Sequence, residues 1–175
     1  VESAPIACAL PRLWLSPDET ETVRSFAYVS VSDGVGVGLV TDGEALRGEA
    51  HTAGEFGHVS IDMHGPQCVC GKKGCWEAFT CNAATVGRYV DRMLRQRTGG
   101  APDGIRRRAA SRDDAPHDHP PTIEDVVRRA RRGEPEAAAA VAETGWYIGR
   151  GLAAVVSAFN PGRIYVGGEI TAAWD

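Results

Sequence analysis

The sequence predicts an α/β fold, in which helices pack against a β-sheet. One observation is the run FAYVSV from Phe26 to Val31, which is rich in the aromatic and β-branched residues that strands favour. A second is the recurrence of apolar residues at helical spacing over Ala83–Arg95 and again over Pro135–Phe159. Because the two kinds of segment alternate along the chain, we expect a layered α/β architecture. The length of 175 residues and the 43% hydrophobic content are consistent with one domain over 1–175.

The segment after the first strand predicts further β-structure. Alternate glycines from Gly34 to Gly38 punctuate the chain before Leu39 and Val40, which predicts a strand, a glycine turn and a second strand. Asp42-Gly43 is a typical hairpin turn. A short returning strand is therefore expected over Ala45–Arg47.

The C-terminal half predicts two helices and a strand. Thr122, with Asp125 three positions later, resembles a capped helix start, although the usual partner in a capping box is Glu or Gln. A proline suits the first turn of the long Pro135–Phe159 helix. Three glycines, at positions 145, 149 and 151, are expected to loosen that helix. Arg163–Val166 then predicts a strand.

Residues 98–121 are rich in Gly, Pro, Asp, Arg and His and have no hydrophobic periodicity. This composition predicts an exposed insertion or a flexible loop. The many arginines between Arg92 and Arg132 suggest either a solvated face or nucleic-acid binding, and the solvated face is the simpler interpretation. His117 and His119 have a metal-like spacing, but nothing nearby completes a ligand set.

Charge and cysteine content restrict the possible functions. A net charge of −4 does not indicate a nucleic-acid-binding surface, so any DNA contact is expected from a segment outside this chain. No apolar run approaches the roughly 20 residues that span a bilayer, and a cytoplasmic protein without membrane contact is expected. The cysteines are odd in number, and Cys68 and Cys70 are too close in sequence to pair easily. Metal binding in a reducing compartment explains them better than disulfides do.

The most specific motif places His58, Cys68, Cys70 and Cys75 within HVSIDMHGPQCVCGKKGC. One imidazole and three thiolates form a closed tetrahedral ligand set, as in structural zinc sites. The alternative is a cluster of free buried thiols. Two acidic residues, at positions 55 and 77, flank the motif, and folding around one ion would bring their carboxylates together.

The runs GEFGH and CVCGKKGCWE resemble the ROK family, which groups sugar kinases with sugar-responsive transcriptional repressors on an actin-like ATPase (ribonuclease H-like) fold. SDGVGVGLVTDGEALRG resembles the second phosphate loop of the family, and NPGRIYVGG resembles its late strand and nucleotide-side turn. The resemblance covers nearly the whole chain except residues 97–121. It implies that 1–175 is part of a longer domain, mainly the sugar-binding and zinc-containing lobe. The residues that match the phosphate loop and the nucleotide-side turn are Asp33, Gly34, Gly36, Gly38, Gly167 and Gly168.

The resemblance also implies a sugar site. Glu55 and Glu77 match carboxylates that accept hydrogen bonds from sugar hydroxyls. His58 matches a histidine that both binds zinc and contacts the sugar, because the metal fixes the tautomer and direction of its ring. The alternative is that the two carboxylates only pair with nearby cations or with protons of the zinc ligands.

Two positions depart from a kinase. Alignment of the helix that ends at Leu13-Trp14 places Ser3 and Ala4 where the family has an asparagine and the catalytic aspartate. Alanine cannot accept a proton, and loss of a general base slows a reaction about 10²- to 10⁴-fold. Asp33 replaces a small hydroxyl residue and would repel a γ-phosphate, unless its side chain points away or helps to hold a metal.

These departures favour the effector-binding portion of a sugar-responsive transcriptional regulator with a structural zinc ion. The resemblance implies a homo-oligomer and an absent N-terminal winged helix-turn-helix that binds operator DNA. An active ATP-dependent sugar kinase is the alternative, with Mg²⁺-ATP as cofactor and with Asp33 or Glu2 as the base. A third possibility is a zinc-stabilised interaction module without a small ligand.

Overall fold

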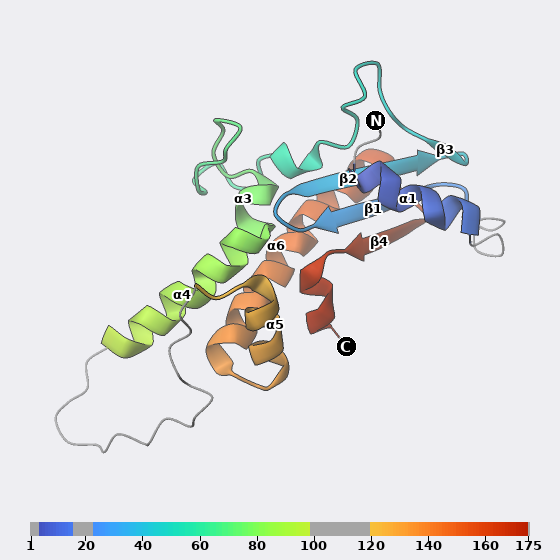
Figure 1. The fold of residues 1–175 in the computed structure, drawn as a ribbon. Helices are drawn as coiled ribbons and strands as arrows, with labels where there is room; N and C mark the ends of the chain where they lie inside the picture. Colours follow the sequence, from blue (N-terminus) through green and yellow to red (C-terminus); the bar gives the residue numbers. More distant parts are fainter. Residues whose placement is uncertain (1–3, 16–22, 99–119, 175) are drawn as a thin grey trace, which may run out of the picture.

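A four-stranded mixed sheet forms the centre of the computed structural model, which describes residues 4–15, 23–98 and 120–174 (Figure 1). The strand order is β3-β2-β1-β4. β1 is antiparallel to β2 and parallel to β4, so the late strand pairs directly with the first one. The strands are β1 (Phe26–Val31), β2 (Val35–Thr41), β3 (Glu44–Ala45) and β4 (Arg163–Gly167).

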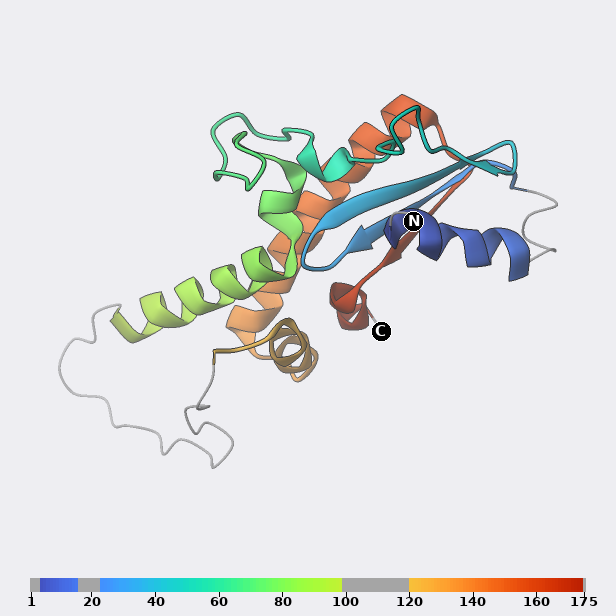
Figure 2. The same ribbon diagram turned by 45° about the horizontal axis from the view of Figure 1, so that its top comes forward.

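Helices cover both faces of this sheet, which confirms the predicted α/β class. Figure 2 shows α1 on one face and the long α6 on the other. Neither α3 nor the short helix before it was expected from the sequence, and α4 is longer than predicted at both ends. The helices are α1 (Ala4–Leu15), η1 (Phe56–His58), α3 (Trp76–Thr80), α4 (Asn82–Thr98), α5 (Ile123–Arg131), α6 (Pro135–Phe159) and η3 (Glu169–Ala173).

The expected order of strand, turn and strand is confirmed, but only Gly34 lies in the turn, because Gly36 and Gly38 lie inside β2. The turn instead comprises Ser32 to Gly34, where the Ser32 N–H donates to the Gly34 carbonyl over 2.9 Å. A Cβ atom at Gly36 or Gly38 would lie 2.5 or 2.4 Å from atoms of Pro5. The glycines thus remove side chains from the strand where the start of α1 packs on it.

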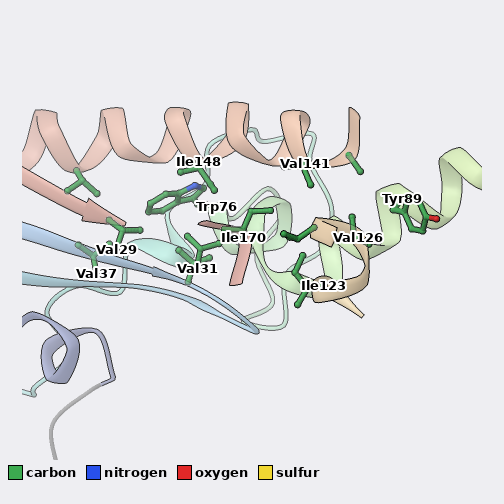
Figure 3. Packing of buried hydrophobic residues seen from close by; sticks show 14 of the residues in the cluster. Val29, Val31, Val37, Trp76, Tyr89, Ile123, Val126, Val141, Ile148 and Ile170 are labelled. Carbon is green, nitrogen blue, oxygen red and sulfur yellow. The ribbon is translucent and has the colours of Figure 1, made fainter. Parts of the chain in front are cut away.

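The opposite face of the sheet carries the main hydrophobic core (Figure 3). Val29, Val31 and Val37 point toward α6, and Trp76 fills the space between the sheet and the helix. The Trp76 indole Nε1 donates to the Tyr147 carbonyl over 3.0 Å. Trp76 and the valines are almost completely buried. This core connects the sheet to the segment that carries the metal motif.

The glycines of α6 do not loosen the helix, which is continuous from Pro135 to Phe159. Gly151 faces the Trp76 ring, and a Cβ atom there would lie 1.9 Å from it. Gly145 and Gly149 would meet nothing within 4 Å. The glycine at 151 is therefore required by packing, whereas its two neighbours are not.

The sequence patterns at the ends of helices and strands predict those ends with differing accuracy. The predicted start of α5 is confirmed, since Thr122 and Asp125 form a complete capping box. The hairpin strand β3 ends at Ala45, two residues earlier than expected. Most of the expected 98–121 loop, including His117 and His119, lies outside the described residues. None of the described helices combines the length and the apolar character needed to span a bilayer.

Candidate functional site

The GEFGH segment is held against β2 by its two glycines. Gly54 has a φ of 100°, and its carbonyl accepts the Val37 N–H over 3.0 Å. A Cβ atom at Gly54 would lie 1.9 Å from the Val37 oxygen, and one at Gly57 would lie 2.0 Å from the Val35 oxygen. Only glycine allows this approach of two backbones. The segment therefore forms η1 on the sheet and places His58 at its last turn.

Backbone turns shape the loop that carries the three cysteines. The Cys68 N–H donates to the Lys72 carbonyl over 2.8 Å, and the Gly71 N–H returns to the Cys68 carbonyl over 3.0 Å. Gly74 has a φ of 69°, and a Cβ atom there would lie 1.5 Å from the Asp62 oxygen. The Ile61 N–H donates to the Gly74 carbonyl over 2.8 Å. These contacts fold the loop back toward η1.

His58, Cys68, Cys70 and Cys75 meet in one cluster, whose ligand atoms all lie within 4.8 Å of one another. The Cys70 and Cys75 sulfurs are 3.6 Å apart, and the Cys68 sulfur is 3.6 Å from His58 Nδ1. Tetrahedral zinc with ordinary bond lengths separates two sulfurs by roughly 3.8 Å and a sulfur from a nitrogen by roughly 3.6 Å. The donor set and its spacing fit a structural zinc ion.

The thiols of this cluster differ in acidity. Burial, together with the neighbouring Cys70 and Cys68 thiols, raises the pKa of Cys75 to about 12. The pKa of Cys70 is lowered, chiefly by a hydrogen bond from the Lys72 backbone. Metals bind the thiolate form, so a bound cation would displace the proton of Cys75.

Glu77 connects the metal cluster to the turn between β1 and β2. Its Oε1 atom lies 4.0 Å from His58 Nδ1, and its Oε2 atom accepts the Val35 N–H over 2.9 Å. A Cβ atom at Gly34 would lie 3.0 Å from Oε2, so glycine leaves room for the carboxylate. Because His58 Nδ1 faces the Cys68 thiol, its Nε2 is the nitrogen that remains for a ligand.

Glu55 lies at the start of η1, next to the same histidine. Its carbonyl accepts the His58 N–H over 3.2 Å, whereas its carboxylate makes no capping hydrogen bond. The residue is exposed. Glu77 and the exposed Glu55 thus lie near His58, and these residue types suit a ligand rich in hydroxyl groups.

A second polar cluster lies at the β1–β2 turn, and Asp33 is the member of it that was predicted from the sequence. The Glu169 carboxylate accepts hydrogen bonds from Ser32 Oγ over 3.1 Å and from Asn82 Nδ2 over 3.2 Å. Asn82 Nδ2 also lies 3.2 Å from Asp33 Oδ1. The Gly167-Gly168 turn positions Glu169, since a Cβ atom at Gly168 would lie 1.7 Å from the Val31 oxygen. Glu169 was missed from the sequence, where the available signal was an acidic residue directly after a glycine pair at a strand end.

Among the described residues, Ala4, Cys8 and Cys81 are not part of the metal cluster. Ala4 is exposed at the start of α1, and Glu2 and Ser3 lie outside the described residues. Cys8 is exposed and Cys81 is partly buried, and neither joins the described metal cluster.

Comparison with protein families shows that residues 14–175 match the ROK family. The chain is 31% identical over 145 residues to the DNA-binding transcriptional dual regulator NagC of Escherichia coli, covering 83% of this chain and 32% of that protein. It is 27% identical over 143 residues to the xylose repressor of Bacillus subtilis, covering 82% of this chain and 31% of the repressor. The chain thus spans about a third of the length of these curated relatives.

Solved structures similar to the chain include both a regulator and a kinase. A ROK family transcriptional regulator, a homologue of the E. coli Mlc protein, aligns with a TM-score of 0.78 and 31% identity over 99% of this chain and 40% of its own. A ROK family glucokinase from Streptomyces griseus, in complex with glucose and AMPPNP, aligns with a TM-score of 0.76 and 25% identity over 99% of this chain and 53% of its own. These matches agree with the actin-like sugar kinase fold.

Proposed function

Because the chain belongs to the ROK family, we propose that it is the sugar-sensing part of a transcriptional regulator. The family matches 162 of its residues, 14–175, and the curated relatives named above are regulators of transcription. The observation that carries the proposal is the position of Glu77, whose carboxylate lies between the His58 imidazole and the β1–β2 turn. A sugar bound there would contact both the metal-ordered loop and the sheet.

Each residue of the proposed site has a defined task. Glu55 and Glu77 would accept hydrogen bonds from sugar hydroxyls, since ionised carboxylates form the stronger kind of hydrogen bond. His58 would contact a hydroxyl through Nε2 while its Nδ1 binds zinc. The three cysteines would complete the metal site, and a bound zinc ion would order the loop and fix the imidazole tautomer.

Ala4 supports a role in sensing instead of phosphoryl transfer. At the position where the family resemblance places the base, alanine has no group that accepts a proton from an attacking hydroxyl. Asp33 adds a carboxylate at the turn that matches the phosphate loop. The chain would therefore bind its sugar and release it unchanged.

A sugar kinase is the second candidate, and its support is the similarity to the glucokinase from S. griseus. It requires another carboxylate, such as Asp33 or Glu2, to act as the base, and Mg²⁺-ATP as the phosphoryl donor. Asp33 Oδ1 accepts a hydrogen bond from Asn82 Nδ2.

Regulation would follow from a difference in sugar affinity between two arrangements of the lobes. A sugar that binds one arrangement of the lobes more tightly shifts the protein toward that arrangement. In a homo-oligomer, this shift would change the spacing of N-terminal winged helix-turn-helix domains on operator DNA. A third class, an interaction module without a small ligand, would leave operator affinity unchanged across every sugar tested.

The proposal is tested with the complete parent protein, Mg²⁺-ATP and a panel of sugars. Phosphorylation is assayed by product formation, and sugar binding is followed in parallel by calorimetry. Binding without turnover is expected. Turnover would establish the kinase candidate. A separate measurement of affinity for operator DNA would contradict the regulator if no sugar changed that affinity.

A further inference from the structure

We propose that the effector is a sugar without a phosphate group, because Asp33 and Glu169 place negative charge at the end of the site where a phosphate would bind. This inference rests on the proposed sugar-sensing function and specifies its ligand. It concerns the β1–β2 turn, Ser32 to Gly34, together with Val35 at the start of β2. Glu169 contacts Ser32, and Glu77 contacts Val35.

Two hydrogen-bond donors at this turn are used by carboxylates of the chain, and a third is used by a backbone carbonyl. The Val35 N–H donates to Glu77 Oε2 over 2.9 Å, and the Ser32 hydroxyl donates to Glu169 Oε1 over 3.1 Å. The Ser32 N–H donates to the Gly34 carbonyl over 2.9 Å. A phosphate loop binds its ligand through such backbone and hydroxyl donors. A phosphate that accepted hydrogen bonds from the Val35 N–H and the Ser32 hydroxyl would have to displace two carboxylates.

One neutral amide holds the two carboxylates of Asp33 and Glu169. Asn82 Nδ2 lies 3.2 Å from Asp33 Oδ1 and 3.2 Å from Glu169 Oε2. Asn82 is 8% exposed, and its backbone N–H donates to the Ser32 carbonyl over 2.8 Å. Its Oδ1 is buried without a hydrogen-bond partner among the described residues. The side-chain amide of Asn82 therefore donates to both carboxylates, whereas its own carbonyl oxygen accepts no hydrogen bond among the described residues. This arrangement suits acceptors that are ionised.

Glu169 is ionised at neutral pH. A hydrogen bond from its own backbone N–H lowers the pKa of its carboxyl, and Asn82 and Ser32 lower it further, while burial acts in the opposite direction. The turn therefore carries a permanent charge of the same sign as a phosphate. Repulsion by two such charges is expected to weaken binding of a phosphorylated ligand on the order of 10- to 100-fold.

Arginines at the C-terminal end of α5 and at its C-cap carry positive charge that would attract a phosphate, in contrast to Asp33 and Glu169. Glu169 borders an open hollow of about 490 Å³ that is also lined by Arg128, Arg131 and Arg132. Arg128 pairs with Asp125 on its own helix. If these arginines outweighed the two carboxylates, the protein would prefer a phosphorylated ligand, and the binding experiment distinguishes the two outcomes.

The experiment compares free sugars with their own 6-phosphates by calorimetry on the zinc-loaded complete parent protein. We expect a free sugar to bind and its 6-phosphate to bind at least about 10-fold more weakly. Equal or tighter binding of the 6-phosphate would overturn the inference and leave sugar sensing intact. If neither form of any sugar binds, the proposed function fails together with the inference.

Variants test whether the two carboxylates cause the selectivity. Asp33→Asn, Glu169→Gln and the double variant keep the shape of the turn and remove its charge. The ratio of the two affinities should fall about 10-fold or more in the double variant. Glu44→Gln, on the exposed edge strand β3, removes the same charge elsewhere and should retain the wild-type ratio. A double variant that folds, judged by its melting curve, and keeps the wild-type ratio would refute the inference.

Discussion

The Glu77 carboxylate accepts the backbone N–H of Val35 over 2.9 Å, although the two residues are 42 positions apart. The same carboxylate lies 4.0 Å from His58 Nδ1. One side chain therefore joins the segment ordered by the metal motif to the turn between β1 and β2. Any ligand that hydrogen-bonds to Glu77 acts on both segments at once.

Glu77→Gln should weaken sugar binding about 10- to 100-fold, because a hydrogen bond to a charged group contributes roughly 1.5–3 kcal/mol. The amide also replaces one acceptor oxygen by a donor. Calorimetry with the sugar that binds best measures the effect. Glu49→Gln, at an exposed loop position, is the matched control and should bind like the wild type. Wild-type affinity of Glu77→Gln would contradict the proposed sugar site.

Cys70→Ser should lower the zinc content of the purified protein and its melting temperature. The serine hydroxyl is a poor zinc ligand, and structural zinc contributes directly to folding. Metal content per chain and a thermal melt, with and without a chelator, measure both effects. Cys8→Ser changes an exposed cysteine outside the cluster and should keep its zinc. Unchanged zinc in Cys70→Ser would exclude the assigned metal centre.

Gly151→Ala should destabilise the protein, because the new Cβ atom would lie 1.9 Å from the Trp76 ring. Overpacking of a core typically costs about 1–3 kcal/mol. Gly145→Ala and Gly149→Ala provide matched controls in the same helix, since a Cβ atom there meets nothing within 4 Å. These controls should be neutral or stabilise α6 by up to about 1 kcal/mol. Urea unfolding of the zinc-loaded protein measures all three, and equal effects would contradict the packing argument.

Tyr89 should make stability depend on alkaline pH. Burial raises its pKa to about 12 from an ordinary value of 10.0, and its hydroxyl donates to Glu134 Oε1 over 2.8 Å. A raised pKa in the folded state means that the contribution of the neutral phenol is complete below pH 10 and is lost as the pH rises toward 12. The free energy of unfolding should therefore fall over this interval.

The Tyr89→Phe variant separates this contribution from other alkaline effects. Phenylalanine does not titrate, so the variant should show a shallower decline between pH 10 and 12. It should also be less stable at neutral pH by roughly 1.5–3 kcal/mol, since it lacks the hydrogen bond to a carboxylate. Identical alkaline slopes for both proteins would show that Tyr89 does not cause the dependence.

Several parts of the fold could be predicted because they depend on short stretches of sequence. The α/β class, the first strand and the start of α5 each follow from residue type and local spacing, and the Thr122–Asp125 capping box involves neighbours only. The cluster of His58 and three cysteines could also be predicted, since the three cysteines lie within eight residues and close spacing restricts their possible positions.

The glycines show why other parts of the fold could not be predicted from the sequence. In the sequence, Gly36 looks like a turn residue and Gly151 looks like a flexible point in a helix. In the structure, Gly36 accommodates Pro5 of α1, and Gly151 accommodates the Trp76 ring. The reason for each glycine is a side chain from a distant segment, and spacing along the chain carries no information about that partner.

The sequence by itself determined which residues can bind a metal, roughly where the strands and the longer helices lie, and that no carboxylate occupies position 4. Only the tertiary structure decided that Glu77 meets Val35 and that Asn82 links Asp33 to Glu169. Glu169 reaches the β1–β2 turn because β1 pairs with β4, whereas Glu77 and Asn82 reach it because α3 and the start of α4 pack beside the sheet. Hydrogen bonds across such pairings depend on the packed sheet, whereas ligand type and capping depend on residue chemistry alone.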